Sequence, residues 1–131
     1  MQHRMLDGGV VEIIPARLGD ERGFFSEVWN AGMQQLTGVT GAFVQDNHSM
    51  SVKPGVLRGL HYQLPPFAQA KLVRVTRGAI LDVVVDVRRS SPGFGRWQAV
   101  RISAEDWNQL FVPEGFAHGF LTLEPETEVQ Y

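Results

Sequence analysis

The chain has 131 residues, with 12 lysines and arginines against 14 aspartates and glutamates, and it contains no cysteine. A formal net charge of −2 argues against a nucleic-acid-binding protein, which normally carries a basic stripe. The lack of cysteine excludes disulfides, thiolate catalysis and cysteine-ligated zinc, and it makes the cytoplasm the expected compartment. Residues 1–13 hold no continuous apolar run, so no signal peptide is expected, and the apolar stretch 80–85 is too short to cross a membrane.

Strand patterns separated by turn signals fill most of the sequence. In chain order, strands are expected at 10–14 and 23–28, a helical turn or two at 27–36, and strands at 42–49 and 56–62 joined by a turn at 53–55. The clearest feature is a hairpin over 71–87, which reverses at Gly78 because glycine suits the positive φ of a tight turn. Shorter strands follow at 97–102, 109–112, 119–123 and 128–131. This spacing predicts one β-sandwich or barrel domain over residues 1–131.

One segment, 58–63, places polar residues where a strand would ordinarily be apolar. Period-two alternation puts Arg58 on one face of this strand and His61 on the opposite face. An imidazole that binds no metal suits a general base, because its pKa lies near neutral pH. The alternative is that His61 is merely a hydrogen-bonded residue of the barrel.

A second segment, 112–120, has the spacing P-x-G-x-x-H. Pro113 and Gly115 predict a tight turn, after which His118 points into the barrel as the next strand begins. His61 and His118 without a carboxylate partner are too few ligands for a firm metal site, so no metal is expected.

Several polar residues elsewhere suit a large anionic ligand. Arg22 precedes a strand, and Lys71 follows the loop 65–70. Arginine offers phosphate a bidentate fork, whereas lysine acts as a point charge; a solvated surface position is the alternative for both. The polar run Gln45, Asp46 and Asn47 could hydrogen-bond sugar hydroxyls or a pyrimidine, or it could form an exposed edge strand.

Alternation also gives Asp82 the same face as Val84 and Asp86. One carboxylate of this row is expected to reach the barrel interior. Asp82 is then a hydrogen-bond partner of His118 or, alternatively, an ion-paired surface residue.

Taken together, these segments resemble the dTDP-4-dehydrorhamnose 3,5-epimerase family of the cupin superfamily. The resemblance extends over nearly the whole chain in one register, and it is carried by 55–63, 69–73, 78–88, 91–97 and 112–120. The last of these is, by itself, similar to the second sequence motif of cupins. The resemblance implies an all-β fold, a cupin-type double-stranded β-helix (jelly-roll barrel) with one or two short helical turns.

The resemblance also implies roles for individual residues. His61 matches the family's general base, and Tyr131 matches its general acid. Other positions match substrate-binding residues, some of them contributed across a dimer interface: Arg22, Glu27, Gln45, Asp46, Asn47, Arg58, Lys71 and His118. Phe24 and Phe25 are candidates to stack on the nucleotide base. No cofactor is implied, and the expected assembly is a homodimer in which the N-terminal strand at 10–14 completes the partner's sheet.

The implied reaction is the metal-free epimerisation of dTDP-4-keto-6-deoxyglucose at C3 and C5 to dTDP-4-keto-rhamnose. The C4 ketone acidifies the hydrogens on C3 and C5, so a base can remove either one and leave an enolate, which an acid on the opposite face reprotonates with inversion. Charge that develops on the C4 oxygen needs a donor, for which Lys71 or Arg58 is suited. The alternatives are an epimerase acting at one centre only, a sugar-nucleotide-binding cupin without catalysis, and a metal-dependent cupin.

In one respect the sequence departs from the family pattern. The family normally continues well past the tyrosine that matches Tyr131, and this continuation supplies an aspartate that pairs with the catalytic histidine. We therefore expect residues 1–131 to form a cupin-type domain without that C-terminal segment. If these residues are the whole protein, His61 lacks its partner, Tyr131 lies on a fraying end, and weak or absent activity would follow. The alternative is that they are a shortened piece of a longer chain.

Overall fold

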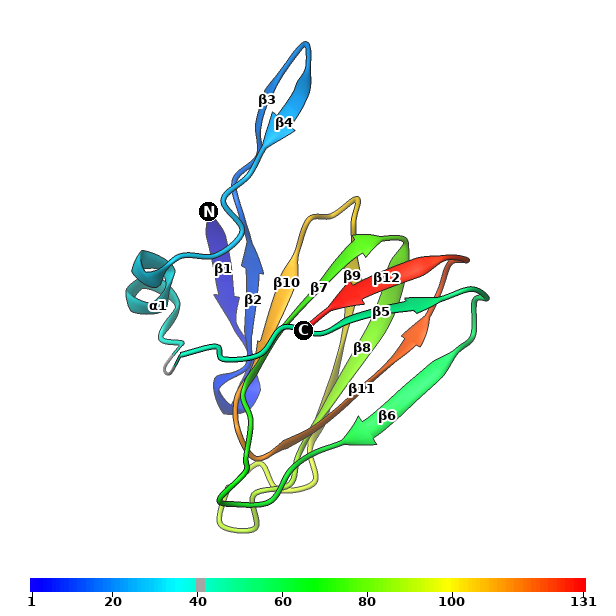
Figure 1. The fold of residues 1–131 in the computed structure, drawn as a ribbon. Helices are drawn as coiled ribbons and strands as arrows, with labels where there is room; N and C mark the ends of the chain where they lie inside the picture. Colours follow the sequence, from blue (N-terminus) through cyan, green and yellow to red (C-terminus); the bar gives the residue numbers. More distant parts are fainter. Residues whose placement is uncertain (40–41) are drawn as a thin grey trace.

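Two antiparallel sheets face each other in the computed structural model, which describes residues 1–39 and 42–131 (Figure 1). One sheet has the order β1-β2-β10-β7-β12-β5, and the other has the order β6-β11-β8-β9. A further pair, β3 and β4, projects from the barrel as an arm (Figure 1). The strands are β1 (Gln2–Met5), β2 (Val11–Ile14), β3 (Leu18–Asp20), β4 (Gly23–Phe25), β5 (His48–Ser51), β6 (Leu57–His61), β7 (Lys71–Arg77), β8 (Ala79–Asp86), β9 (Trp97–Ser103), β10 (Gln109–Val112), β11 (Phe116–Thr122) and β12 (Thr127–Gln130). The predicted all-β jelly roll is confirmed.

The main hydrophobic core fills the space between the two sheets. Its strands are rich in valine and isoleucine, which favour the pleated, half-buried environment of a sheet. Alternate residues point inward, so Ile80 and Val84 of β8 meet Val73 and Val75 of β7 across the core. A smaller cluster covers the outer face of the six-stranded sheet with Val11, Ile13, Val39 and Phe111. The inner faces of both sheets therefore carry the main core, and the outer face of the six-stranded sheet carries the smaller cluster.

The hairpin predicted over 71–87 is wrong. β7 pairs with β10 and β12, whereas β8 pairs with β9 and β11 in the opposite sheet. Gly78 does turn the chain at a φ of 78°, but it carries the chain from one sheet to the other. A Cβ at this position would lie 2.4 Å from Thr127 Oγ1, so the crossing leaves no room for a side chain.

The strand predicted at 42–49 is also mostly wrong, because β5 begins only at His48 and residues 42–47 are irregular. The expected helix over 27–36 is observed as α1 (Ala31–Thr37). It starts at residue 31 because the Asn30 side chain accepts a hydrogen bond of 3.0 Å from the backbone N–H of Met33, which is an N-cap. β1 and β3 had no clear signal in the sequence and were missed. Within the described ranges, no helix is both long and apolar enough to span a bilayer.

An ion pair between the buried Asp86 and the half-buried Arg88 closes the turn that follows β8. Asp86 accepts hydrogen bonds from Nε and Nη2 of Arg88 at 2.9 and 2.8 Å, and from Ser91 Oγ at 2.6 Å. The Arg88 side chain is the main reason why the pKa of Asp86 is held well below its usual range, while burial acts in the opposite direction. The carboxylate therefore stabilises the fold above its unfolded pKa of about 4, and this stabilisation is lost as the pH falls below that value.

We expect Asp86→Asn to lower the free energy of unfolding at pH 7 by about 1–2 kcal/mol, because it removes the charged acceptor of Arg88, whose side chain is 36% exposed and still reaches water. The difference between wild type and variant should shrink as the pH falls below about 4. Urea unfolding at a series of pH values measures both effects. Asp20→Asn is the matched control, since Asp20 also pairs with an arginine, Arg22, but on the exposed arm. A constant difference at every pH would contradict the prediction.

Candidate functional site

The two predicted site residues of β6 share one face, and the prediction that they lie on opposite faces is wrong. In the ladder between β6 and β11, His61 lies opposite His118 and Arg58 lies opposite Phe120, with a register shift between the two pairs. Three steps along β6 thus match two steps along β11, which is the mark of a β-bulge. Because residues directly opposite each other share a face, Arg58 and His61 both join the inward-facing row of β11.

The bulge depends on two glycines that face each other across β6 and β11. A Cβ on Gly59, which has a φ of 111°, would lie 2.7 Å from Gly119 Cα. A Cβ on Gly119 would lie 2.6 Å from the carbonyl oxygen of Arg58. Only glycine at both positions allows the two backbones to approach so closely.

His118 and Asp82 form a buried pair directly beside His61. His118 Nε2 lies 2.7 Å from Asp82 Oδ2, and the side chains are 6% and 0% exposed. The contact anticipated from alternation is therefore present. Burial raises the pKa of Asp82, and the hydrogen bond from His118 opposes that rise. Because the carboxylate accepts from Nε2–H, the Nδ1 atom is left to face other groups in the interior.

A double-mutant cycle measures how strongly Asp82 and His118 are coupled. We expect Asp82→Ala and His118→Ala each to destabilise the fold, and the pair to show a coupling free energy of about 1–3 kcal/mol, because each single change strands a buried polar partner. Chemical denaturation of the four proteins gives the value. Arg89→Ala combined with His118→Ala is the control cycle, since Arg89 is exposed. Additivity of the Asp82 and His118 changes would show that the contact carries no energy.

Arg58 lies at the seam where the two sheets meet. Its Nε and Nη2 donate to Ser51 Oγ at 3.3 and 3.2 Å, and Nη2 also donates to the carbonyl of Met50 at 3.3 Å. Ser51 belongs to β5, an edge strand of the six-stranded sheet, and β6 is an edge strand of the other sheet. The guanidinium is thus fixed at the open side of the barrel, near the exposed His61.

Lys71 and Tyr131 belong to the opposite sheet. Lys71 lies opposite Val112 in register and alternates with Val73, so it takes the inward face of β7. Tyr131 alternates with the inward Val129 and packs against the main core. Burial lowers the pKa of the Lys71 ammonium. A negative charge close by would oppose this effect and favour the charged ammonium.

The expectation that Tyr131 would fray is wrong. Its backbone N–H donates to the Asn47 carbonyl at 3.0 Å, and its carbonyl accepts from the Asn47 backbone N–H at 2.8 Å. The side-chain Nδ2 of Asn47 donates to the same carbonyl at 3.0 Å, and Gln45 Nε2 donates to Asn47 Oδ1 at 2.8 Å. The polar run 45–47 therefore holds the tyrosine in place through the backbone.

A cavity of about 590 Å³ extends from Lys71 and Tyr131 over the outer face of the six-stranded sheet. Segment 42–47 covers it, and Asp46 is among its lining residues. Gln109 also lines it; this side chain is buried, its amide donates to the Val28 carbonyl, and its Oε1 has no partner. His61 and His118 do not line this cavity. They lie side by side on the inward face of the other sheet, so a ligand that contacts both must approach that face.

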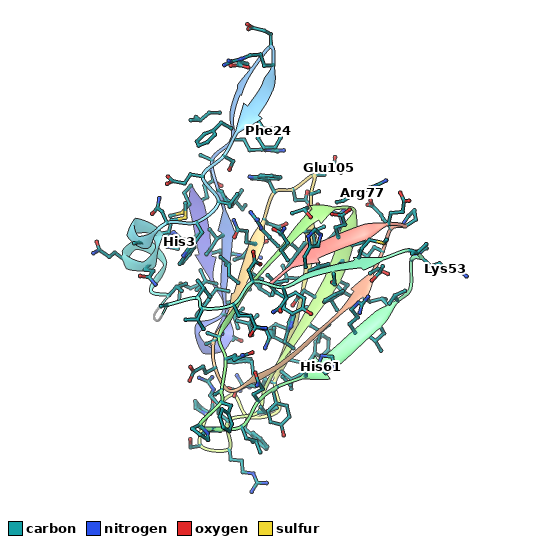
Figure 2. All side chains as sticks on the ribbon, in the orientation of Figure 1. His3, Phe24, Lys53, His61, Arg77 and Glu105 are labelled. Atoms are coloured by element: carbon teal, nitrogen blue, oxygen red, sulfur yellow. The ribbon has the colours of Figure 1, made fainter. Side chains whose placement is uncertain are left out.

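Three of the predicted binding residues lie away from this group. Arg22 is at the tip of the β3–β4 arm, where it pairs with Asp20, Phe24 is on β4, and Glu27 is exposed just after the arm. Figure 2 shows Phe24 and His61 far apart. One chain therefore does not bring these residues to His61. Among the described residues, no three histidine, aspartate or glutamate side chains gather as metal ligands would.

One well-ordered group was not found from the sequence. Trp107 packs edge-on against Phe24, and its ring centroid lies 4.9 Å from that of the phenylalanine. The residues are distant in the chain, and Trp107 lies in a turn without any recognisable motif, so no sequence signal connected them.

The fold and the polar groups on its inner faces define the cupin-type class of jelly-roll proteins. A model of the dTDP-4-dehydrorhamnose 3,5-epimerase family matches residues 6–131, and the chain belongs to that family. It is 57% identical over 118 residues to the dTDP-4-dehydrorhamnose 3,5-epimerase of Shigella flexneri, which covers 89% of this chain but only 65% of that protein. The chain thus spans less than two thirds of this relative's length.

Solved structures agree with this assignment. The dTDP-4-dehydrorhamnose 3,5-epimerase of Bacillus anthracis, with TDP and pyrophosphate bound, superposes with a TM-score of 0.93 at 45% identity and covers 98% of this chain and 75% of its own. ChmJ, a 3'-monoepimerase from Streptomyces bikiniensis in complex with dTDP-quinovose, superposes with a TM-score of 0.84 at 37% identity, covering 96% of this chain and 65% of its own.

Proposed function

We propose that this chain carries the catalytic groups of an epimerase that inverts C3 and C5 of dTDP-4-keto-6-deoxyglucose and yields dTDP-4-keto-rhamnose. The observation that carries the proposal is the placement of His61 and Tyr131 on the inward sides of two sheets that face each other. A sugar ring between them would have a base on one face and an acid on the other. Inversion of a carbon next to a ketone requires this arrangement.

Each inversion is a pair of proton transfers. His61 removes the hydrogen from C3 or C5 as a proton, and the electron pair of the broken C–H bond becomes the enolate of the C4 ketone. The Tyr131 hydroxyl then gives its proton to the opposite face of the same carbon. His61 returns the captured proton to water, and the Tyr131 phenolate takes one back, so both groups are restored.

The remaining groups hold the charge of the intermediate and the substrate. The Lys71 ammonium is suited to donate to the C4 oxygen as negative charge develops there. Arg58, fixed on Ser51, offers a forked donor to the diphosphate. His118, oriented by Asp82, provides a further ring nitrogen beside His61. Gln45, Asp46 and Asn47 lie beside Tyr131 and are suited to the sugar hydroxyls or the base. No cofactor enters this scheme.

A second candidate is inversion at one centre only. The likeness to ChmJ, which is a 3'-monoepimerase, favours it. Both reactions use the same enolate chemistry, and they differ in which hydrogen the bound sugar presents to the base. The 3,5-epimerase is preferred because the Bacillus anthracis and Shigella flexneri relatives, which carry that name, share more of the sequence.

The strand expected to be exchanged, at 10–14, is β2, which lies between β1 and β10 of its own sheet. A homodimer in which the β3–β4 arms are exchanged would instead complete the site. Leu18 and Phe25 on the arm are 69% and 68% exposed, and among the described strands β3 and β4 pair only with each other. A two-stranded hairpin is marginally stable by itself, so a second copy is a suitable surface for it. Arg22 and Glu27 would then reach the partner's site, with Phe25 as the aromatic residue free to stack on the base, since Phe24 packs against Trp107 of its own chain. We also propose that the protein is cytoplasmic, because a chain without cysteine lacks the disulfides that are typical of small secreted domains.

Incubation with dTDP-4-keto-6-deoxyglucose in D₂O tests the function. Deuterium at both C3 and C5, detected by NMR together with the epimerised product, is the expected result. Deuterium at one carbon would identify the single-centre enzyme. Binding of dTDP without any exchange would overturn the catalytic proposal.

A further inference from the structure

The direction of the β3–β4 arm is fixed only at its base. β3 and β4 pair with each other and with no other strand in the described part of the chain. At the tip, Arg22 and Asp20 form an ion pair within the arm. These interactions hold the hairpin together, but they do not determine where it points. Any contact that orients it must lie where the arm leaves the barrel (Figure 1).

Such a contact is a cluster of Arg17, Phe24 and Trp107, which we call the arm clasp. Phe24 and Trp107 meet at a ring-centroid distance of 4.9 Å and an interplanar angle of 80°, the edge-to-face arrangement that aromatic pairs prefer. The Arg17 guanidinium lies 5.6 Å from each ring centroid, within cation–π range. Three side chains from both sides of the arm and from the barrel thus hold one another.

Two hydrogen bonds connect the two ends of the arm to the loop 104–108 of the barrel. Trp107 Nε1 donates to Ser26 Oγ at 2.9 Å, just past the end of β4. Arg17 Nη2 donates to the Glu105 carbonyl at 3.3 Å, just before β3 begins. Both ends of the hairpin are therefore attached to the loop that joins β9 and β10.

Trp107 also has an unusual backbone conformation. Its φ is 60°, in the left-handed region that is rare for a bulky residue. Such a conformation persists only where surrounding contacts determine it, and it often marks a functional position. The indole makes those contacts with the arm.

We propose that Trp107 is a positioning residue, which through the arm clasp directs the β3–β4 arm so that Arg22 and Phe25 reach the sugar-nucleotide site of a second copy of the chain. This inference rests on the proposed function and on the exchanged dimer. Trp107 itself does not contact the substrate. It determines how much of the partner's site is formed before the substrate arrives, and its effect is therefore on substrate binding rather than on proton transfer.

The test compares Trp107→Ala with Trp107→Phe in the complete chain. Hydrogen exchange of residues 18–25, followed by mass spectrometry, should accelerate roughly tenfold in Trp107→Ala, the factor expected when an aromatic pair and its cation–π partner are lost. The KM for the sugar nucleotide should rise by a similar factor with kcat unchanged. Trp107→Phe keeps a ring for Phe24 and Arg17, so its exchange rate and its KM should stay close to the wild-type values. Phe94→Ala, in an exposed turn far from the arm, is the control.

Unchanged exchange of residues 18–25 in Trp107→Ala would overturn the proposal. Faster exchange without any change in KM would overturn it as well, since the arm would then move without consequence for the site. If the wild-type protein shows no turnover, the proposed function fails, but the affinity for dTDP and the dimer dissociation constant by sedimentation still test the clasp. In Trp107→Ala the affinity for dTDP should fall and the dimer dissociation constant should rise. In Trp107→Phe both should return toward the wild-type values.

Discussion

We expect the replacement of His61 with asparagine to abolish both deuterium exchange and epimerisation. The base that breaks the C–H bond is then absent, and a positioned proton transfer is worth about 10²–10⁴ in rate. Because the enolate has to form before either carbon is inverted, C3 and C5 should lose activity together. His61 is exposed, so the variant should fold and bind dTDP as the wild type does. NMR in D₂O and calorimetric titration of dTDP measure the two properties separately.

His48→Asn is the matched control for this variant. His48 is also an exposed strand histidine, but it bonds Glu128 at 3.0 Å on the six-stranded sheet. It should retain full exchange. Wild-type exchange in His61→Asn would remove His61 as the base, and loss of dTDP binding in that variant would show that the residue binds rather than reacts.

Replacing Tyr131 with phenylalanine should separate exchange from inversion. His61 can still remove a proton, exchange it with solvent and return a deuteron to the same face. The opposite face has lost its acid, so the product should form about 10²–10⁴ times more slowly while deuterium still enters with retained configuration. The backbone bonds between Tyr131 and Asn47 do not involve the hydroxyl, so this variant should keep its structure. NMR distinguishes retained from inverted deuterated sugar.

Tyr62→Phe, which changes the chain's other tyrosine on an exposed loop, is the control and should behave as the wild type. Inverted product at the wild-type rate from Tyr131→Phe would mean that water or another group is the acid. Loss of exchange as well as inversion would mean that Tyr131 takes part in removing the proton.

The sequence located part of the site's geometry, and the roles of its residues stay predictions. Alternation along β8 predicted that a carboxylate reaches the interior, and of the two alternatives for Asp82 the structure shows the contact with His118. Alternation failed for Arg58 and His61 because it assumes an unbroken ladder. The bulge that brings both to one face depends on the close approach of β6 to β11, which is a tertiary contact.

The fold class could be predicted from the strand patterns in the sequence, but the pairing of the strands could not. Valine-rich alternation in β7 and β8 identifies two strands but not their partners. A tight turn at Gly78 fits a hairpin and a crossing between sheets equally well, and the choice is made by β10, β11 and β12 further along the chain. Segment 42–47 has strand-forming residues yet stays irregular, since its side chains and backbone are used to hold Tyr131.

The crossing at Gly78 also has a consequence for how the protein is made. Because β7 and β8 do not pair with each other, the central strands cannot form early as a local unit. β10 has to find β2 near the start of the chain, and among the described strands β5 pairs only with β12, which is residues 127–130. Domains dominated by such distant pairings refold in roughly milliseconds to seconds. During synthesis, the six-stranded sheet remains incomplete until β12 has left the ribosome, and until then the apolar residues Val73 and Val75 of β7 are exposed to aggregation with other chains.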